Sequence, residues 1–159
     1  MKLLRTVRAD PSDTFVFERA AEPGEWAISG TFMFARLDPT TLVGKARAAF
    51  RGGFLGINSL GWSTLARIAE ASEEDRSAAV EQLAVRLVEH FGAPDLTTAR
   101  AAAAEEIAFA ASLCDHPVGM LIAVSRRCDD EGTHEVFRIL RPNAPEHVDL
   151  PALARGDHP

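Results

Sequence analysis

The sequence predicts an α+β fold: a single domain with a mostly antiparallel sheet covered on one face by a helical hairpin. Residues 72–115 carry apolar side chains at helical spacing on both sides of a short Gly-Ala-Pro turn, which is typical of two consecutive helices. Residues 26–34 alternate large apolar with smaller side chains, as a half-buried strand does. Residues 118–127 and 134–140 flank an acidic turn that ends in glycine, and this pattern predicts a β-hairpin.

The N-terminal part of the chain predicts a strand meander followed by a helix and a further strand. Residues 3–8 alternate in polarity, residues 14–17 have high β-propensity, and residues 26–34 show the best period-two pattern in the chain. These three segments form the predicted meander. Residues 38–50 predict a short helix, and residues 62–71 predict the strand that follows it.

The first helix of the hairpin has start and stop signals. Ser72 can accept a hydrogen bond from the backbone of the first turn, and Asp75 stands three residues on, where its carboxylate can return the bond. Gly92 suits the left-handed residue that follows a helix, and Pro94 cannot continue one. The apolar stripe expected to face the sheet consists of Val80, Leu83, Ala84, Leu87, Val88 and Phe91.

The second helix is expected to begin after a cap residue, Asp95, and to end near Cys114. Pro117 forces the residue before it toward an extended conformation, so the helix has to stop there. The predicted stripe is Leu96, Ala99, Ala103, Ile107, Ala110 and Cys114, and Phe109 and Leu113 extend the apolar surface. A helix with small apolar residues on most sides packs close to its neighbours, which predicts a central position.

One domain, residues 1–141, accounts for all the periodic segments of this 159-residue chain. Residues 142–159 are rich in proline and polar side chains and predict an extended C-terminal tail. The formal net charge of −6 disfavours nucleic acid or an anionic membrane as the partner. No apolar run approaches the roughly 20 residues that span a bilayer, and the first eight residues are too charged for a signal peptide. We therefore expect a cytoplasmic protein.

A glycine-rich stretch, residues 51–62, is the first candidate for a binding site. Glycine lets backbone N–H groups approach an anion closely, although the stretch matches neither the P-loop nor the dinucleotide-binding pattern. The ligand-binding residues of this hypothesis are Arg51, Gly52, Gly53, Trp62 and, from the second helix, Glu105. The competing interpretation is an irregular crossover whose large apolar side chains fill the core. A Gly53→Ala exchange separates the two, because it abolishes binding without unfolding in the first case only.

Cys114, Asp115 and His116 are the only local group of nucleophile, acid and base types. The helix dipole raises the pKa of a thiol at a C-terminal end, and Cys114 also lies on the apolar stripe, so a buried, unreactive thiol is predicted. A metal site that adds Cys128 and His134, or a disulfide, fails on distance, since a strand of about 30 Å would separate them. A smaller site from Cys128, His134 and a turn acid stays open. We predict no catalytic residue, no metal and no cofactor.

Glu105 and Glu106 form a pair of acids midway along the most apolar helix. A buried carboxyl group with a raised pKa is suited to proton transfer. The interpretation that we favour from the sequence is that one or both side chains reach solvent or pair with an arginine. Of the two acids, only Glu105 is therefore included among the residues of the predicted binding site.

Three stretches carry a resemblance: residues 50–56 (FRGGFLG), 61–65 (GWSTL) and 105–119, whose core is AFAASLC. With residues 3–17 they resemble a family of small uncharacterised proteobacterial proteins, over most of the chain. The resemblance implies no activity, substrate or catalytic residue. It implies a genomic setting among genes for a biotin/lipoate-ligase-like protein and for maturation of molybdenum-dependent formate dehydrogenase.

The function we expect is that of a non-enzymatic cytoplasmic accessory protein. It would contact another protein or a second copy of itself, in the maturation of a redox or cofactor-dependent enzyme. The alternative is a small-ligand-binding protein, or an enzyme of unrecognised type, that uses residues 51–62. A deep pocket lined by Arg51, Trp62 and acids of the second helix would favour this alternative, whereas a flat apolar patch or a symmetric dimer would favour the first.

Overall fold

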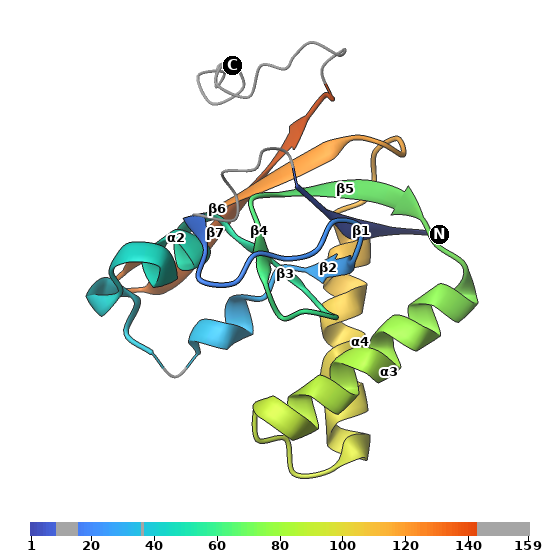
Figure 1. Cartoon of the computed structure of the whole chain (residues 1–159), viewed down its shortest axis with the longest axis horizontal. Helices are drawn as coiled ribbons and strands as arrows, with labels where there is room; N and C mark the ends of the chain where they lie inside the picture. Colours follow the sequence, from blue (N-terminus) through green and yellow to red (C-terminus); the bar gives the residue numbers. More distant parts are fainter. Residues whose placement is uncertain (9–15, 36, 143–159) are drawn as a thin grey trace.

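A computed structural model describes residues 1–8, 16–35 and 37–142 of the chain (Figure 1). Within these residues seven strands form one antiparallel sheet in the order β4-β3-β2-β1-β5-β6-β7. The strands are β1 (Lys2–Val7), β2 (Trp26–Ile28), β3 (Phe54–Gly56), β4 (Trp62–Ser63), β5 (Leu65–Glu70), β6 (Leu121–Asp129) and β7 (Gly132–Leu140). The predicted hairpin near residue 130 is therefore confirmed as β6 and β7.

Helices cover this sheet in the way the sequence predicted. They are α2 (Gly44–Gly52), α3 (Glu73–His90) and α4 (Leu96–Ser112), with the short 3-10 helices η1 (Thr31–Phe34) and η2 (Pro39–Thr41). The pair α3 and α4 packs together beneath the sheet, and α2 lies against β6, at the side of the molecule away from the N-terminus (Figure 1). The predicted α+β class, with a helical hairpin on one face, is confirmed.

Both helices of the hairpin begin at the residues that the sequence marked. The Ser72 hydroxyl accepts a hydrogen bond from the Asp75 N–H at 3.0 Å, and the Asp75 carboxylate accepts one from the Ser72 N–H at 2.9 Å. Asp95 accepts one from the Thr98 N–H at 2.7 Å. Each cap satisfies backbone donors that the first helical turn leaves unpaired, which fixes where the helix starts.

The core lies between the hairpin and one face of the sheet. Cross-strand pairs on that face are fully or almost fully buried: Leu4 lies opposite Ile68, and Ala66 opposite Ile122. The helices bury Ala79, Leu83, Ala84 and Leu87 from α3 and Ala99, Ala103, Ile107 and Ala110 from α4. The small residues of α4 let it approach both α3 and the strands, as predicted. The helix is not central, because Ala101, Ala102 and Phe109 are exposed on its other side. Val88 was expected inside and is 38% exposed.

The sheet curls back on itself around β4 and β5. Thr64 alone separates these strands in the sequence, yet three other strands lie between them in the sheet order. The curl brings the Ser63 hydroxyl next to the end of β1, where it accepts a hydrogen bond from the Val7 N–H at 3.2 Å and lies 2.8 Å from the Val7 carbonyl oxygen. The predicted strand over residues 62–71 is therefore two strands joined by a bend.

Two predictions about the N-terminal part are wrong, and a third is partly outside the described residues. The strand predicted over residues 26–34 ends at Ile28, because Gly30 adopts a left-handed conformation (φ 77°) and the chain turns into η1. The helix predicted over residues 38–50 is split into η2 and α2 by extended backbone at Leu42. Residues 14 and 15 are not described, and Val16 and Phe17 belong to no strand. The predicted tail is not described from residue 143 on.

The glycine-rich stretch is more regular than an irregular crossover: it contains the end of α2 and the β3–β4 hairpin. Glu25, which is buried, holds the turn of that hairpin. Its carboxylate accepts hydrogen bonds from the N–H groups of Asn58 at 2.9 Å and Ser59 at 2.8 Å. Gly56 leaves room for this carboxylate, since a Cβ there would lie 2.5 Å from Glu25 Oε1. Close packing therefore accounts for glycine at this position.

Gly52 and Gly53 are adjacent, yet we expect replacement by alanine to change the free energy of unfolding in opposite directions at the two positions. A Cβ on Gly53 would lie 2.8 Å from Trp62 Cε3 and 3.0 Å from the Ala49 carbonyl oxygen, whereas one on Gly52 meets only the Val124 carbonyl oxygen at 3.6 Å. Gly53→Ala should lower the free energy of unfolding by about 1–3 kcal/mol. Gly52→Ala should raise it by about 0.5 kcal/mol. Urea denaturation measures both, and equal stabilities of the two variants would contradict this packing.

Candidate functional site

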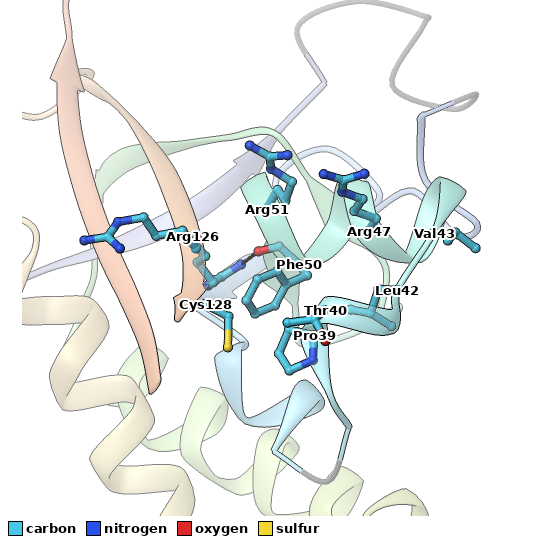
Figure 2. Close-up of a pocket in the computed structure, with 10 residues that line it drawn as sticks. Pro39, Thr40, Leu42, Val43, Arg47, Phe50, Arg51, Arg126 and Cys128 are labelled. Carbon is cyan, nitrogen blue, oxygen red and sulfur yellow. Dashed lines mark hydrogen bonds between the residues drawn. The ribbon is translucent and has the colours of Figure 1, made fainter. Parts of the chain in front are cut away.

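A cavity of about 390 Å³ opens between α2, η2 and β6 (Figure 2). We call it the arginine cleft. Its lining residues are Pro39, Thr40, Leu42, Val43, Arg47, Phe50, Arg51, Arg126, Arg127 and Cys128. Four arginines thus converge from two elements that are far apart in the sequence, and the lining combines guanidinium groups with an apolar portion.

The helix α2 brings two of these arginines to one side of the cleft. Arg47 and Arg51 are four residues apart, so their side chains leave the same face of the helix, and Figure 2 shows them pointing the same way. Within the described residues neither guanidinium has a hydrogen bond or an ion pair. The helix also carries Lys45 and no acid. Like charges at this spacing destabilise a helix by about 0.2–0.5 kcal/mol, so helix stability does not account for the presence of both arginines.

The strand β6 supplies the other two arginines, and both of them are paired. Successive residues of a strand point to opposite faces, so Arg126 is buried and its neighbour Arg127 is exposed. The Arg127 guanidinium lies 3.0 Å from the Asp129 carboxylate. Arg126 forms an ion pair with Glu135 of β7, with 2.8 Å between Nε and Oε2. The two arginines of β6 are therefore neutralised, and those of α2 are not.

Arg126 also joins three parts of the chain through backbone carbonyl groups. Its fully buried guanidinium donates hydrogen bonds to the carbonyl oxygens of Phe50 at 3.0 Å and Gly53 at 2.9 Å, at the end of α2, and to that of Ser29 (Figure 2 shows the Phe50 bond). Burial lowers the pKa of Arg126, and the bond to Glu135 opposes that shift. Arginine stays charged in proteins, so this is a buried cation that fixes α2 against β6.

The apolar part of the cleft comes from η2 and the following residues. The Phe50 ring is 4% exposed and packs edge-on against Phe34, with 5.2 Å between ring centroids. Pro39 and Leu42 are half-buried beside it, and Figure 2 shows Pro39 and Cys128 close to the ring. The cleft can therefore contact an anionic group with its arginines and an apolar body with this wall.

The structure brings only some of the residues predicted from the glycine-rich hypothesis to this site. Arg51 lines the cleft, and Gly52 and Gly53 connect its helix to β3. Trp62 does not line it: its ring is buried against Phe34, with 5.4 Å between the centroids. Glu105 is exposed on α4 and does not line it either.

Sequence reasoning missed Arg47 and Arg126. An unpaired arginine four residues before Arg51, on a helix without acids, was a signal for the first. The signal for Arg126 was its position two residues after Val124 and four after Ile122, which places it on the same buried face of the strand. Neither signal identifies the partners, because these lie on other elements.

The remaining candidate residues lie at two places, after the end of α4 and at the tip of the β6–β7 hairpin. The predicted burial of Cys114 is confirmed, and burial raises the pKa of its thiol to about 11, although Lys2 opposes the shift. Its lack of reactivity stays a prediction. His116 is exposed. At the tip of the β6–β7 hairpin His134 lies 2.9 Å from Asp129. In the described part of the chain no three His, Cys, Asp or Glu residues are grouped as metal ligands would be.

The acid pair of α4 divides into an exposed and a half-buried residue. Glu105 reaches solvent, as expected. Glu106 is half-buried, and burial raises its pKa, with further contributions from the negative charges of Glu135 and Glu105. Glu135 already accepts hydrogen bonds from Arg126 and Thr31 through Oε2. No described residue donates a hydrogen bond to Glu106, so the favoured interpretation holds for Glu105 alone.

The comparisons with known proteins identify a family and no function. A family model described as a family of unknown function (DUF6505) matches residues 1–154, and the chain belongs to this family. No curated protein and no solved structure matches the chain. The resemblance to a family of uncharacterised proteins is therefore confirmed, while its proteobacterial origin stays a prediction. None of the helices in the described residues has the length and apolarity needed to cross a membrane.

The raised pKa of Glu106 predicts a pH-dependent effect of its removal. The folded protein binds the proton of this carboxyl more tightly than the unfolded chain does, so the wild type loses stability as the pH rises from the ordinary value near 4.5 through the raised folded pKa. Glu106→Gln should therefore raise the free energy of unfolding at pH 8, and the gain should shrink toward pH 4.5. Urea denaturation across this range measures it, and Glu131→Gln, in the exposed turn between β6 and β7, is the control. A gain that grows on acidification would contradict the assignment.

Proposed function

We propose that this protein is a binding protein rather than an enzyme and that it holds an anionic ligand in the arginine cleft. The observation that carries the proposal is the pair Arg47 and Arg51, which lie together beside a cavity with no acid partner among the described residues. Elsewhere the chain has an excess of acids, with a formal net charge of −6. A local cationic site on such a protein attracts anions while the rest of the surface repels them.

The composition of the cleft supports binding rather than acid–base chemistry. Its described lining contains no Asp, Glu or His, the side chains that most often transfer protons in catalysis. Cys128 is half-buried, and its sulfur lies 3.9 Å from the Asp129 carbonyl oxygen, which is not a base that could activate it. The guanidinium groups and the apolar wall are suited to recognition of charge and shape.

A narrower form of the proposal adds a biological setting. The protein would act in the bacterial cytoplasm as an accessory protein in the maturation of a redox or cofactor-dependent enzyme. The anionic group would then be a small molecule handed on to that enzyme or part of a partner protein. This narrower form is supported by the genomic setting that the resemblance implies, and the cleft supports only the anionic character of the ligand.

Replacing the two arginines of α2 tests the proposal. We expect Arg47→Gln/Arg51→Gln to weaken binding of small aromatic anions at least about tenfold, because each charge-assisted contact adds roughly 1.5–3 kcal/mol. Isothermal titration calorimetry with benzoate, phenyl phosphate and phenyl sulfate measures the affinities. Without ligand the same variant should be slightly more stable, by a few tenths of a kcal/mol, because a like-charge pair is removed.

Arg67→Gln is the matched control, since Arg67 is exposed on β5, lies outside the cleft and changes the net charge in the same direction. It should bind the anions as the wild type does. The proposal is wrong if no anion binds the wild type, or if the control and the double variant lose affinity equally.

A further inference from the structure

We propose that the group recognised in the arginine cleft is a phosphate monoester dianion, carried on an apolar or aromatic body. This inference rests on the proposed function and names the chemical class of its ligand. It starts from the charge balance of the cleft. Glu135 neutralises Arg126, and Asp129 neutralises Arg127, so two unpaired positive charges remain, on Arg47 and Arg51.

Two guanidinium groups match a phosphate monoester better than a single carboxylate. A phosphate monoester carries a charge of about −1.5 to −2 at pH 7 and three strong acceptor oxygens. A carboxylate carries one negative charge and would leave one of the two cations uncompensated. Each guanidinium presents a planar set of N–H donors that suits bidentate contact with phosphate oxygens. Arg47 and Arg51, on one face of α2, can therefore share one phosphate between them.

The C-terminal end of α2 would ordinarily oppose an anion, and Arg126 removes that obstacle. The last carbonyl groups of a helix carry a partial negative charge. Arg126 donates to the carbonyl oxygens of Phe50 and Gly53 and lies 3.4 Å from that of Ala49, so its guanidinium covers this end of the helix. The negative end of α2 is thus compensated from inside the protein, and the arginines on the helix surface remain available to a ligand.

The helix dipole offers a competing explanation for one arginine only. Arg51 lies in the last turn of α2, where a cation stabilises the helix without any ligand. Arg47 lies a full turn earlier and outside that effect. Its place beside Arg51 adds repulsion to the helix, and the dipole gives no reason for it.

The apolar wall indicates that the phosphate is an ester with a body. Inorganic phosphate would leave the half-buried Pro39 and Leu42 without a ligand contact. A cavity of about 390 Å³ lies at the small end of ordinary ligand sites, which suits a compact ring or short alkyl group attached to the phosphate. The same chemistry could come from a free phosphorylated metabolite or from a phosphorylated side chain of a partner protein.

Small aromatic anions that differ in charge provide the test, and two of them, phenyl phosphate and phenyl sulfate, are esters of nearly the same shape. Phenyl phosphate, phenyl sulfate and benzoate are titrated at pH 7.5 into the wild type, Arg47→Gln, Arg51→Gln and the control Arg67→Gln, with affinities from isothermal titration calorimetry. We expect phenyl phosphate to bind at least about tenfold more tightly than the singly charged phenyl sulfate. Each of Arg47→Gln and Arg51→Gln should remove that preference, and the control should keep it.

The outcomes separate the ligand class from the proposed function. If phenyl sulfate or benzoate binds as tightly as phenyl phosphate, and binding needs both arginines, then the phosphate assignment is wrong and anion binding stands. If no anion binds, both proposals are wrong. A phosphotyrosine peptide, which carries its phosphate on an aromatic ring, is titrated beside phenyl phosphate to identify the source. Tighter binding of the peptide indicates a phosphoprotein, tighter binding of phenyl phosphate indicates a free metabolite, and either result supports the assignment.

Discussion

The constraint on which the rest of this structure depends is the buried charge of Arg126. A guanidinium removed from water is tolerated only when its donors are satisfied and its charge is paired. Here Glu135 pairs with the charge of Arg126, and carbonyl groups from α2 and from the end of β2 accept hydrogen bonds from its donors. These partners lie between 9 and 97 residues away along the chain. One side chain thus fixes the relative positions of a helix, a strand end and a hairpin.

The cleft follows from this constraint. Because Arg126 holds the carbonyl end of α2 against β6, Arg47 and Arg51 of that helix line the same cavity as the residues of β6. The glycines and Glu25 act in the same direction, since they let the β3–β4 hairpin pack tightly beneath the helix end. The interior cation is fully paired, whereas the surface cations are left unpaired at some cost to helix stability. This contrast between paired and unpaired cations is the link between the fold and the binding function that we propose.

Local signals in the sequence predicted the helical hairpin and the β6–β7 hairpin, and long-range packing decided the rest. The caps Ser72 and Asp95 act within a few residues, so the sequence alone locates them. Gly30 has a left-handed conformation just after β2, and a Cβ there would lie 2.6 Å from Leu55 Cβ and 3.0 Å from Trp62 Cζ3. These neighbours follow it by 25 residues or more, so a period-two pattern does not reveal them. At the site Arg51 was predicted, while the glycines beside it serve packing. The groups that accept hydrogen bonds from Arg126 lie on other elements, so the sequence alone does not predict its role.

The most direct test of this account is amide hydrogen exchange in Arg126→Lys. Lysine keeps the positive charge but cannot donate to the carboxylate and to several carbonyl groups at once. If Arg126 fixes α2, amides of residues 44–52 should exchange at least about tenfold faster in the variant, while those of α3 and α4 keep their protection. Unchanged exchange in α2, or an equal loss of protection in all three helices, would contradict the account.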